Sequence, residues 1–170
     1  RWRAEADVFK SQLWMVGESR QKPMVYMSGN GGLGVGLVEA GVRHGVKKCV
    51  FSSTAALFGS AGDKLIDEDT PVDPGSAYGE SKRVVERALY WADRIPGLRS
   101  PCLRYFNAAG RDPQWRAGED PRPDTHLMPQ AIDVALGRWD LPLLFGQVSP
   151  TPDGSRAPES IRVPDLGQPH

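Results

Sequence analysis

The chain has 170 residues, of which 39% are hydrophobic, enough for a core, and its 21 basic and 21 acidic side chains give a formal net charge of +0 at pH 7. The length indicates about one domain, and the charge balance gives no basic excess to attract nucleic acid or an anionic membrane surface. No apolar run approaches the roughly 18–20 residues of a membrane span, and the N-terminal residues lack the apolar core of a signal peptide, so we expect a cytoplasmic protein without a membrane or nucleic-acid partner.

Apolar periodicity and turn residues predict alternating helices and strands. In chain order, the predicted elements are a helix over 35–44 that ends at Gly45, a strand over 47–53, a helix over 77–95, a strand over 99–104, a helix over 127–136 that ends at Gly137 and a strand over 141–145. Strands that alternate with helices at this spacing indicate an α/β fold with a parallel sheet. In such sheets ligands bind beyond the carboxyl ends of the strands, where Thr54 and Asn107 are expected to lie.

Cysteine and histidine are too few and too scattered to predict a metal site. Cys49 and Cys102 each fall within a predicted strand, and we expect both to be buried free thiols. A disulfide or a reactive thiol is the less favoured alternative. The histidines show no metal-ligand spacing with one another or with the cysteines; they are His44, His126 and His170.

Tyr78 and Lys82 form the most informative pair in the chain. They are four residues apart on the first turns of a predicted helix, so both side chains project from one face. A nearby ammonium group favours the phenolate and lowers the pKa of a tyrosine, and a hydroxyl with a lowered pKa can act as acid and base on a substrate alcohol. The structural alternative is an aromatic staple at a helix start beside a solvated charge.

Residues 29–34 match the G-x-G-x-x-G pattern of dinucleotide-binding loops. That pattern requires a strand before it and an acidic residue about 20 positions further on. Residues 24–28 make a poor strand, and residues 50–52 carry no acid. We therefore interpret the segment as a glycine-rich helix start, in which each glycine costs up to about 1 kcal/mol of helix propensity.

Five ordered motifs surround the Tyr78–Lys82 pair and Thr54. They are VGES with KP over 16–23, GVKKCVFSSTAALFG over 45–59, IDEDTPVDPGSAYGESK over 66–82, LRYFNAAGRDP over 103–113, and the set GEDP, THLMPQAIDVALGR, LLFG and TPDG over 118–154. In this order the motifs resemble the UDP-glucose 4-epimerases of the extended short-chain dehydrogenase/reductase family. The resemblance covers roughly residues 13–155.

The resemblance implies a partial Rossmann-like parallel sheet with flanking helices. Members of the family begin with a strand, a glycine-rich turn and a helix before the segment that resembles 16–23. We therefore expect the chain to lack the N-terminal Gly-rich βαβ unit and most of the C-terminal substrate lobe, and to be inactive alone. Residues 1–170 are expected to form a single partial domain, with a Rossmann-like core portion over 13–110 and the start of the sugar-nucleotide-binding portion over 111–170.

The resemblance also implies a reaction, the interconversion of UDP-glucose and UDP-galactose through a 4-keto intermediate, with transient hydride transfer to bound NAD. In that reaction Tyr78 takes the proton from the sugar 4-hydroxyl. Lys82 binds the nicotinamide ribose and holds down the pKa of the tyrosine, and Thr54 bridges the substrate oxygen and the tyrosine. Asn30 and Phe106 match further cofactor contacts.

Further residues match the family's contacts with the UDP-sugar substrate. Besides Thr54 and Tyr78, they are Asn107, His126, Leu127, Leu143, Leu144 and Phe145. Family members pair through two helices, one of which carries the tyrosine and the lysine, so a homodimer is implied for the full-length form.

Two alternatives to a UDP-glucose 4-epimerase stay open. One is another nucleotide-sugar enzyme of the extended family, such as a 4,6-dehydratase or a pentose 4-epimerase. A dehydratase usually has an acid pair after the catalytic Ser/Thr, and the residues after Thr54, Ala55 and Ala56, provide none. The other alternative is a non-catalytic or inactive fragment.

Overall fold

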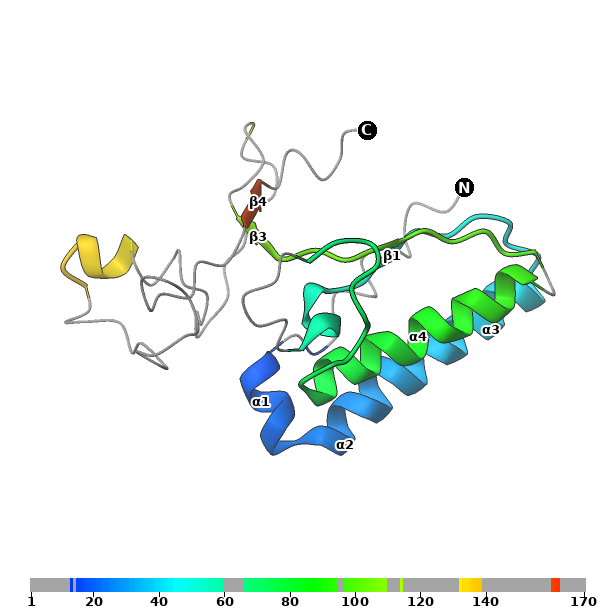
Figure 1. The fold of residues 1–170 in the computed structure, drawn as a ribbon, viewed down its shortest axis with the longest axis horizontal. Helices are drawn as coiled ribbons and strands as arrows, with labels where there is room; N and C mark the ends of the chain where they lie inside the picture. The colour runs from blue at the N-terminus through cyan, green and yellow to red at the C-terminus, as the bar shows by residue number, and fades with distance from the viewer. Residues whose placement is uncertain are drawn as a thin grey trace. The chain divides into compact units, whose positions relative to one another are not determined.

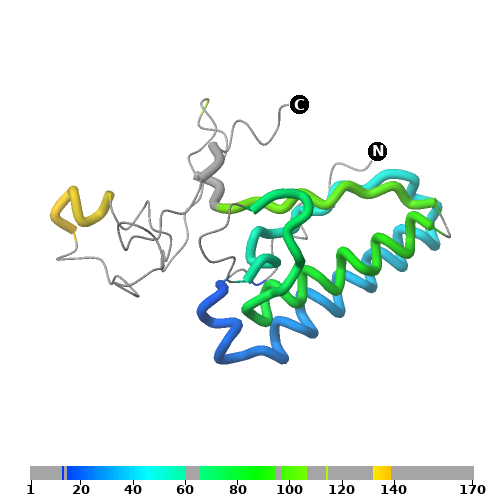
Figure 2. The backbone as a smooth tube through the Cα atoms, in the orientation of Figure 1, coloured from blue at the N-terminus to red at the C-terminus, as the bar shows by residue number. Residues whose placement is uncertain are grey.

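The computed structural model of the chain describes residues 13, 15–59, 66–94, 97–109, 114, 132–138 and 160–162. The chain divides into two compact units, Arg1–Tyr105 and Phe106–His170. Figure 2 follows the backbone of both units from the blue N-terminal helices onward. Because the units contain helices and short parallel strand pairs, the α/β class predicted from the sequence is confirmed.

The first unit contains helices that flank a parallel pair of strands. Its elements are α1 (Val16–Gln21), α2 (Pro23–Tyr26), the π-helix η2 (Met27–Gly32), α3 (Leu33–Arg43), β1 (Phe51–Ser52), the 3-10 helix η3 (Ala55–Phe58), α4 (Ala77–Arg94) and β2 (Cys102–Leu103). The elements α2, η2 and α3 follow one another without a break, and this helical run lies beside α4 (Figure 1). No helix in the described part of the chain is long and apolar enough to cross a membrane.

The strands β1 and β2 pair in parallel, as expected. The paired residues are Phe51 with Cys102 and Ser52 with Leu103. Backbone hydrogen bonds extend this ladder from Cys49, whose N–H donates to the Arg99 carbonyl at 2.9 Å, to Ala55, whose N–H donates to the Tyr105 carbonyl at 2.7 Å. Pro101 fits within the ladder because its carbonyl oxygen is the group that accepts a hydrogen bond from β1.

Apolar side chains from α3, α4 and the strand pair form the core of the first unit. The buried members are Val38, Val85, Leu89, Ala92 and Leu98, and the half-buried members packed against them are Val42, Val46, Cys49, Phe51, Ala88 and Cys102. The predicted helix over 77–95 is confirmed, because α4 carries an apolar face toward this core. Both cysteines are free thiols, as predicted, although they are half-buried and not fully enclosed.

The glycine-rich segment 29–34 lies inside the helical run, so its interpretation as a helix start is wrong in position. Its glycines let α4 approach closely. A Cβ atom on Gly34 would clash with the side chain of Val85, and one on Gly31 would lie 3.7 Å from the carbonyl oxygen of Ser81. Dispersion attraction between the closely packed helices compensates for the low helix propensity of glycine.

Gly79 marks a second close approach, between the start of α4 and η3. A Cβ atom there would lie 2.5 Å from the backbone oxygen of Ala56 and 3.0 Å from Cβ of Pro74. We expect Gly79→Ala to lower the free energy of unfolding by about 1–3 kcal/mol, because overpacking shifts the backbone. Urea unfolding measures the change. The control is Gly36→Ala in α3, where a Cβ meets nothing within 4 Å. Alanine is expected to stabilise the helix at that position. Equal changes in the free energy of unfolding at both positions would contradict the close approach at Gly79.

The second unit pairs β3 (Asn107–Ala109) with β4 (Ser160–Arg162) in parallel. The register places Asn107 opposite Ser160, Ala108 opposite Ile161 and Ala109 opposite Arg162. The helical turn over 132–135 falls within the predicted helix over 127–136, and Gly137 ends it with a φ of 67°. The predicted strand over 141–145 lies outside the described residues.

Candidate active site

Thr54 is fixed in place by the strand ladder and by the helix that it caps. The N–H groups on either side of it, from Ser53 and Ala55, donate to β2-side carbonyls at 2.8 and 2.7 Å. Its own backbone is extended, and its Oγ1 accepts a hydrogen bond from the N–H of Ala56 at 3.1 Å, which caps η3. The side chain is buried. A hydroxyl is therefore held rigidly just past the end of β1.

Tyr78 approaches this hydroxyl from the first turn of α4. Its ring packs edge-on against the fully buried Tyr26, with centroids 6.4 Å apart. Burial raises the pKa of Tyr78, and a hydrogen bond with the Thr54 side chain acts in the opposite direction. A hydrogen bond lowers the pKa of an acid when it is donated to the charged form. Since the Thr54 oxygen already accepts from Ala56, its own proton can be directed at the phenol oxygen.

Lys82 lies one turn further along α4 and is also buried. Its Nζ donates a 3.0 Å hydrogen bond to the carbonyl oxygen of Ser52, and it lies 5.1 Å from the ring centroid of Phe51 and 5.9 Å from that of Tyr78. Burial lowers the pKa of Lys82 to about 8. The structure thus brings Tyr78, Lys82 and Thr54 together, as the sequence predicted.

The electrostatics of this group differ from the expectation that Lys82 lowers the pKa of Tyr78. In the structure the pKa of Tyr78 lies above its ordinary value, and burial is the main cause. The physical reason is that removing both side chains from water disfavours the phenolate and the ammonium alike. At neutral pH the tyrosine is therefore protonated, and the expected lowering does not occur in the chain by itself.

The side chain of Asn30 binds the backbone of Leu13 in the structure. Its side chain is 1% exposed, Nδ2 donates to the Leu13 carbonyl oxygen at 2.6 Å, and Oδ1 accepts from the Leu13 N–H at 3.0 Å. The π-helical turn η2 carries it toward the segment before α1. Each amide atom keeps one further hydrogen-bonding position, so the predicted contact of Asn30 with a cofactor stays a prediction.

The remaining predicted site residues belong to the second unit. Phe106 is 43% exposed, and Asn107 is the first residue of β3. Five others lie outside the described residues: His126, Leu127, Leu143, Leu144 and Phe145. Among the described residues, no group of three or more His, Cys, Asp or Glu side chains is placed to hold a metal ion.

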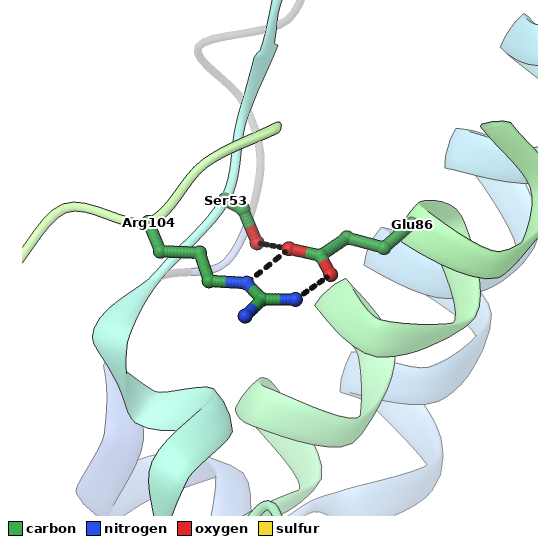
Figure 3. Close-up of polar contacts among 3 residues, drawn as sticks. All are labelled: Ser53, Glu86 and Arg104. Carbon is green, nitrogen blue, oxygen red and sulfur yellow. Dashed lines mark hydrogen bonds and ion pairs between the residues drawn. The ribbon is translucent and has the colours of Figure 1, made fainter. Parts of the chain in front are cut away.

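Sequence reasoning missed a polar cluster on the same face of α4. Ser53 Oγ donates to Glu86 Oε1 at 2.6 Å, and Arg104 donates to both oxygens of Glu86 (Figure 3). A signal was available, because Glu86 continues the four-residue spacing of Tyr78 and Lys82. Tyr26 was also missed, and its position in the sequence gave no comparable signal.

Comparison with known proteins places this geometry in a family. The model of the NAD dependent epimerase/dehydratase family matches residues 12–157. The chain belongs to this family. The resemblance inferred from the sequence is therefore confirmed.

Similar members of the epimerase/dehydratase family include a UDP-glucose 4-epimerase from Halalkalibacterium halodurans, which is 42% identical over 156 residues, 92% of this chain and 47% of that protein. Among solved structures, UDP-glucose 4-epimerase from Brucella ovis in complex with NAD has a TM-score of 0.81 and 36% identity, over 91% of this chain and 47% of that one. The enzyme from Bifidobacterium longum in complex with NAD+ and UDP has a TM-score of 0.81 and 34% identity, over 92% and 48%. The chain spans about half the length of these family members.

The described side chains fit the reacting end of a nicotinamide cofactor. Lys82 provides ammonium hydrogens that suit ribose hydroxyls, beside the hydroxyls of Tyr78 and Thr54. The diphosphate end is different. Residues 29–34 give no phosphate cradle, because their backbone N–H groups lie within a helical run and not at a helix N-terminus.

Proposed function

We propose that this chain carries the acid–base centre of an NAD-dependent nucleotide-sugar 4-epimerase that interconverts UDP-glucose and UDP-galactose. The observation that carries the proposal is the position of Tyr78 on α4, where the Thr54 side chain acts to lower the pKa of its phenol and the buried Lys82 follows four residues later. Family membership and the UDP-glucose 4-epimerases among its relatives support the same reading. The cytoplasmic location stays a prediction.

The residues of the site have separate tasks in this proposal. When bound, NAD would supply the acceptor and donor of the hydride at C4 of the sugar. Tyr78 holds and transfers the proton at the sugar 4-hydroxyl, and Thr54 donates a hydrogen bond that stabilises the phenolate when the proton has left. Lys82 supplies a positive charge and hydrogen-bond donors for the nicotinamide ribose.

A charged Lys82 beside bound substrate offsets the burial that raises the pKa of Tyr78. In the chain by itself burial dominates. When a substrate hydroxyl and a cofactor ribose replace water around Tyr78 and Lys82, the ammonium becomes the nearest compensation for a phenolate. In this proposal the pKa of Tyr78 is therefore lowered only in the complex with substrate and cofactor.

The contacts to the sugar nucleotide are carried in the proposal by residues of the second unit. They are Phe106 beside the nicotinamide, and Asn107, His126, Leu127, Leu143, Leu144 and Phe145 along the UDP-sugar. A homodimer that pairs through α4 is part of the same proposal. So is the division into a Rossmann-like portion over 13–110 and a sugar-nucleotide portion over 111–170.

A 4,6-dehydratase is the second candidate, and the residues after Thr54 argue against it. Elimination of water requires an additional acid near the tyrosine. The residues that follow Thr54 are Ala55, Ala56, Leu57 and Phe58, and they form η3 with Leu57 and Phe58 buried. In this stretch the described chain places no carboxyl group beside the Tyr78 hydroxyl.

The test is a segment exchange, in which this chain replaces the matching residues of the Halalkalibacterium halodurans UDP-glucose 4-epimerase. The relative supplies the rest of its own length. We expect the resulting exchange protein to convert UDP-galactose to UDP-glucose, and a panel with UDP-N-acetylglucosamine and a UDP-pentose reports its preference. An exchange protein that folds and retains NAD but converts no UDP-sugar would contradict the proposal.

A further inference from the structure

A half-buried carboxylate joins three segments next to the candidate site. Glu86 Oε1 accepts hydrogen bonds from Ser53 Oγ at 2.6 Å and from Arg104 Nε at 3.1 Å, and Glu86 Oε2 accepts from Arg104 Nη2 at 2.8 Å. Figure 3 shows Ser53 and Arg104 reaching Glu86 from the two strand ends while Glu86 projects from α4. Every one of these bonds links α4 to a strand end.

Two members of the cluster lie close in sequence to the reacting groups. Ser53 is bonded covalently to Thr54, and its own N–H lies in the strand ladder. Glu86 is one helical turn beyond Lys82 and two beyond Tyr78 on the same face of α4. A shift of α4 along or around its axis therefore moves Tyr78 relative to Thr54 and breaks the hydrogen bonds of Glu86 at the same time.

The two-point contact between Arg104 and Glu86 indicates that the ion pair fixes the position of α4 as well as neutralising a charge. The Glu86 side chain is 12% exposed and that of Arg104 is 32% exposed, so the carboxylate requires a partner. A planar guanidinium that binds both carboxylate oxygens fixes direction as well as distance, which a lysine does not. The Arg104 guanidinium also lies 5.3 Å from the ring centroid of buried Phe58 in η3, the helix that Thr54 caps.

Other ion pairs of α4 lack these properties. Glu80 and Arg83 are 3.8 Å apart on neighbouring turns of the helix, and both side chains are 43% exposed. Asp93 meets Arg99 at 3.2 Å near the far end of α4, with side chains 41% and 81% exposed. Such exposed pairs contribute little, and Glu80 therefore provides a matched control on the same helix.

We propose that Glu86, through Ser53 and Arg104, is a positioning residue that sets the register of α4 against the strand ends and so holds the Tyr78 hydroxyl at the Thr54 hydroxyl. Its importance for turnover rests on the proposed function. The register itself is a property of this chain and is measured without substrate or cofactor, so failure of this inference and failure of the proposed function are distinguishable.

The test is the titration of the Tyr78 phenol, followed by carbon NMR of ring-labelled tyrosine in the 170-residue chain. Tyr78→Phe assigns the signal, and circular dichroism sets the highest pH at which each variant remains folded. Thr54→Val removes the hydrogen bond to the phenolate and is expected to shift the titration to higher pH. We expect Glu86→Gln to shift it in the same direction by half of that amount or more, whereas Glu80→Gln leaves it unchanged.

The direction of the shift separates position from charge. Loss of the negative charge of Glu86 by itself would stabilise the phenolate and move the titration to lower pH. Arg104→Lys retains both charges but loses the two-point contact with the carboxylate. We expect it to shift the titration of Tyr78 to higher pH, as Glu86→Gln does. Arg104→Lys provides the test if Glu86→Gln does not fold. An unchanged or lowered titration in the folded variants overturns the inference, and so does a Thr54→Val variant that titrates like the parent chain.

Discussion

Tyr78→Phe is expected to lower UDP-sugar turnover by the exchange protein about 10²–10⁴-fold, the range for removal of a positioned acid–base group. Phenylalanine keeps the ring that packs edge-on against Tyr26, so the fold and the retention of NAD are expected to be unchanged. Only the hydroxyl that meets Thr54 is lost. Steady-state conversion of UDP-galactose, together with the bound NAD released on denaturation, measures both quantities.

The control for this prediction is Tyr90→Phe, on the same helix. Tyr90 is 42% exposed and lies between the guanidinium groups of Arg87 and Arg94, at 4.9 and 4.1 Å from its ring centroid. Removal of its hydroxyl is expected to leave turnover unchanged. Equal turnover in the parent protein and in Tyr78→Phe would exclude Tyr78 as the acid–base group.

The stability of the chain is expected to rise as the pH increases from about 8, because Lys82 is buried. Its pKa is about 8 in the folded chain against an ordinary value of 10.5. Between these values the unfolded chain binds more protons than the folded chain, so the free energy of unfolding increases with pH. The full effect is about 3 kcal/mol, since each unit of pKa corresponds to roughly 1.4 kcal/mol.

Lys82→Met isolates this contribution. Burial also raises the pKa of the Cys102 thiol from 9.0 to about 11 and that of Tyr26 from 10.0 to about 12. These groups ionise first in the unfolded chain and lower the stability above pH 9, so the rise is clearest just above pH 8. Urea unfolding at several pH values is expected to show that the free energy of unfolding depends less on pH in Lys82→Met than in the parent chain. The same pH dependence in both proteins would contradict a lowered pKa of Lys82.

The sequence predicted the elements whose local pattern and tertiary environment agree. The helix that carries Tyr78 has a clear apolar face, and it begins at the predicted residue, Ala77. The first strand of the parallel pair was predicted because a short apolar run ends in small hydroxylated residues. The group formed by Tyr78, Lys82 and Thr54 followed from family spacing, and the structure brings its members together.

Features that depend on contacts distant in sequence were not predicted. The segment 29–34 is helical because α4 packs against its glycines, a stabilisation that local propensity does not include. The pKa of Tyr78 is raised because burial outweighs the nearby ammonium. The ion pair of Glu86 with Arg104 joins residues 18 positions apart, and no local pattern indicates which carboxylate a strand-end arginine selects.

The most direct test of the central claim uses UDP-galactose that carries deuterium at C4. If hydride leaves C4, resides on NAD and returns to the same carbon while Tyr78 handles the hydroxyl proton, the exchange protein forms UDP-glucose with the deuterium still at C4. Mass spectrometry and proton NMR of the product measure this, and Tyr78→Phe is expected to form almost no product. Loss of the deuterium to solvent, or equal product formation by Tyr78→Phe, would contradict the account.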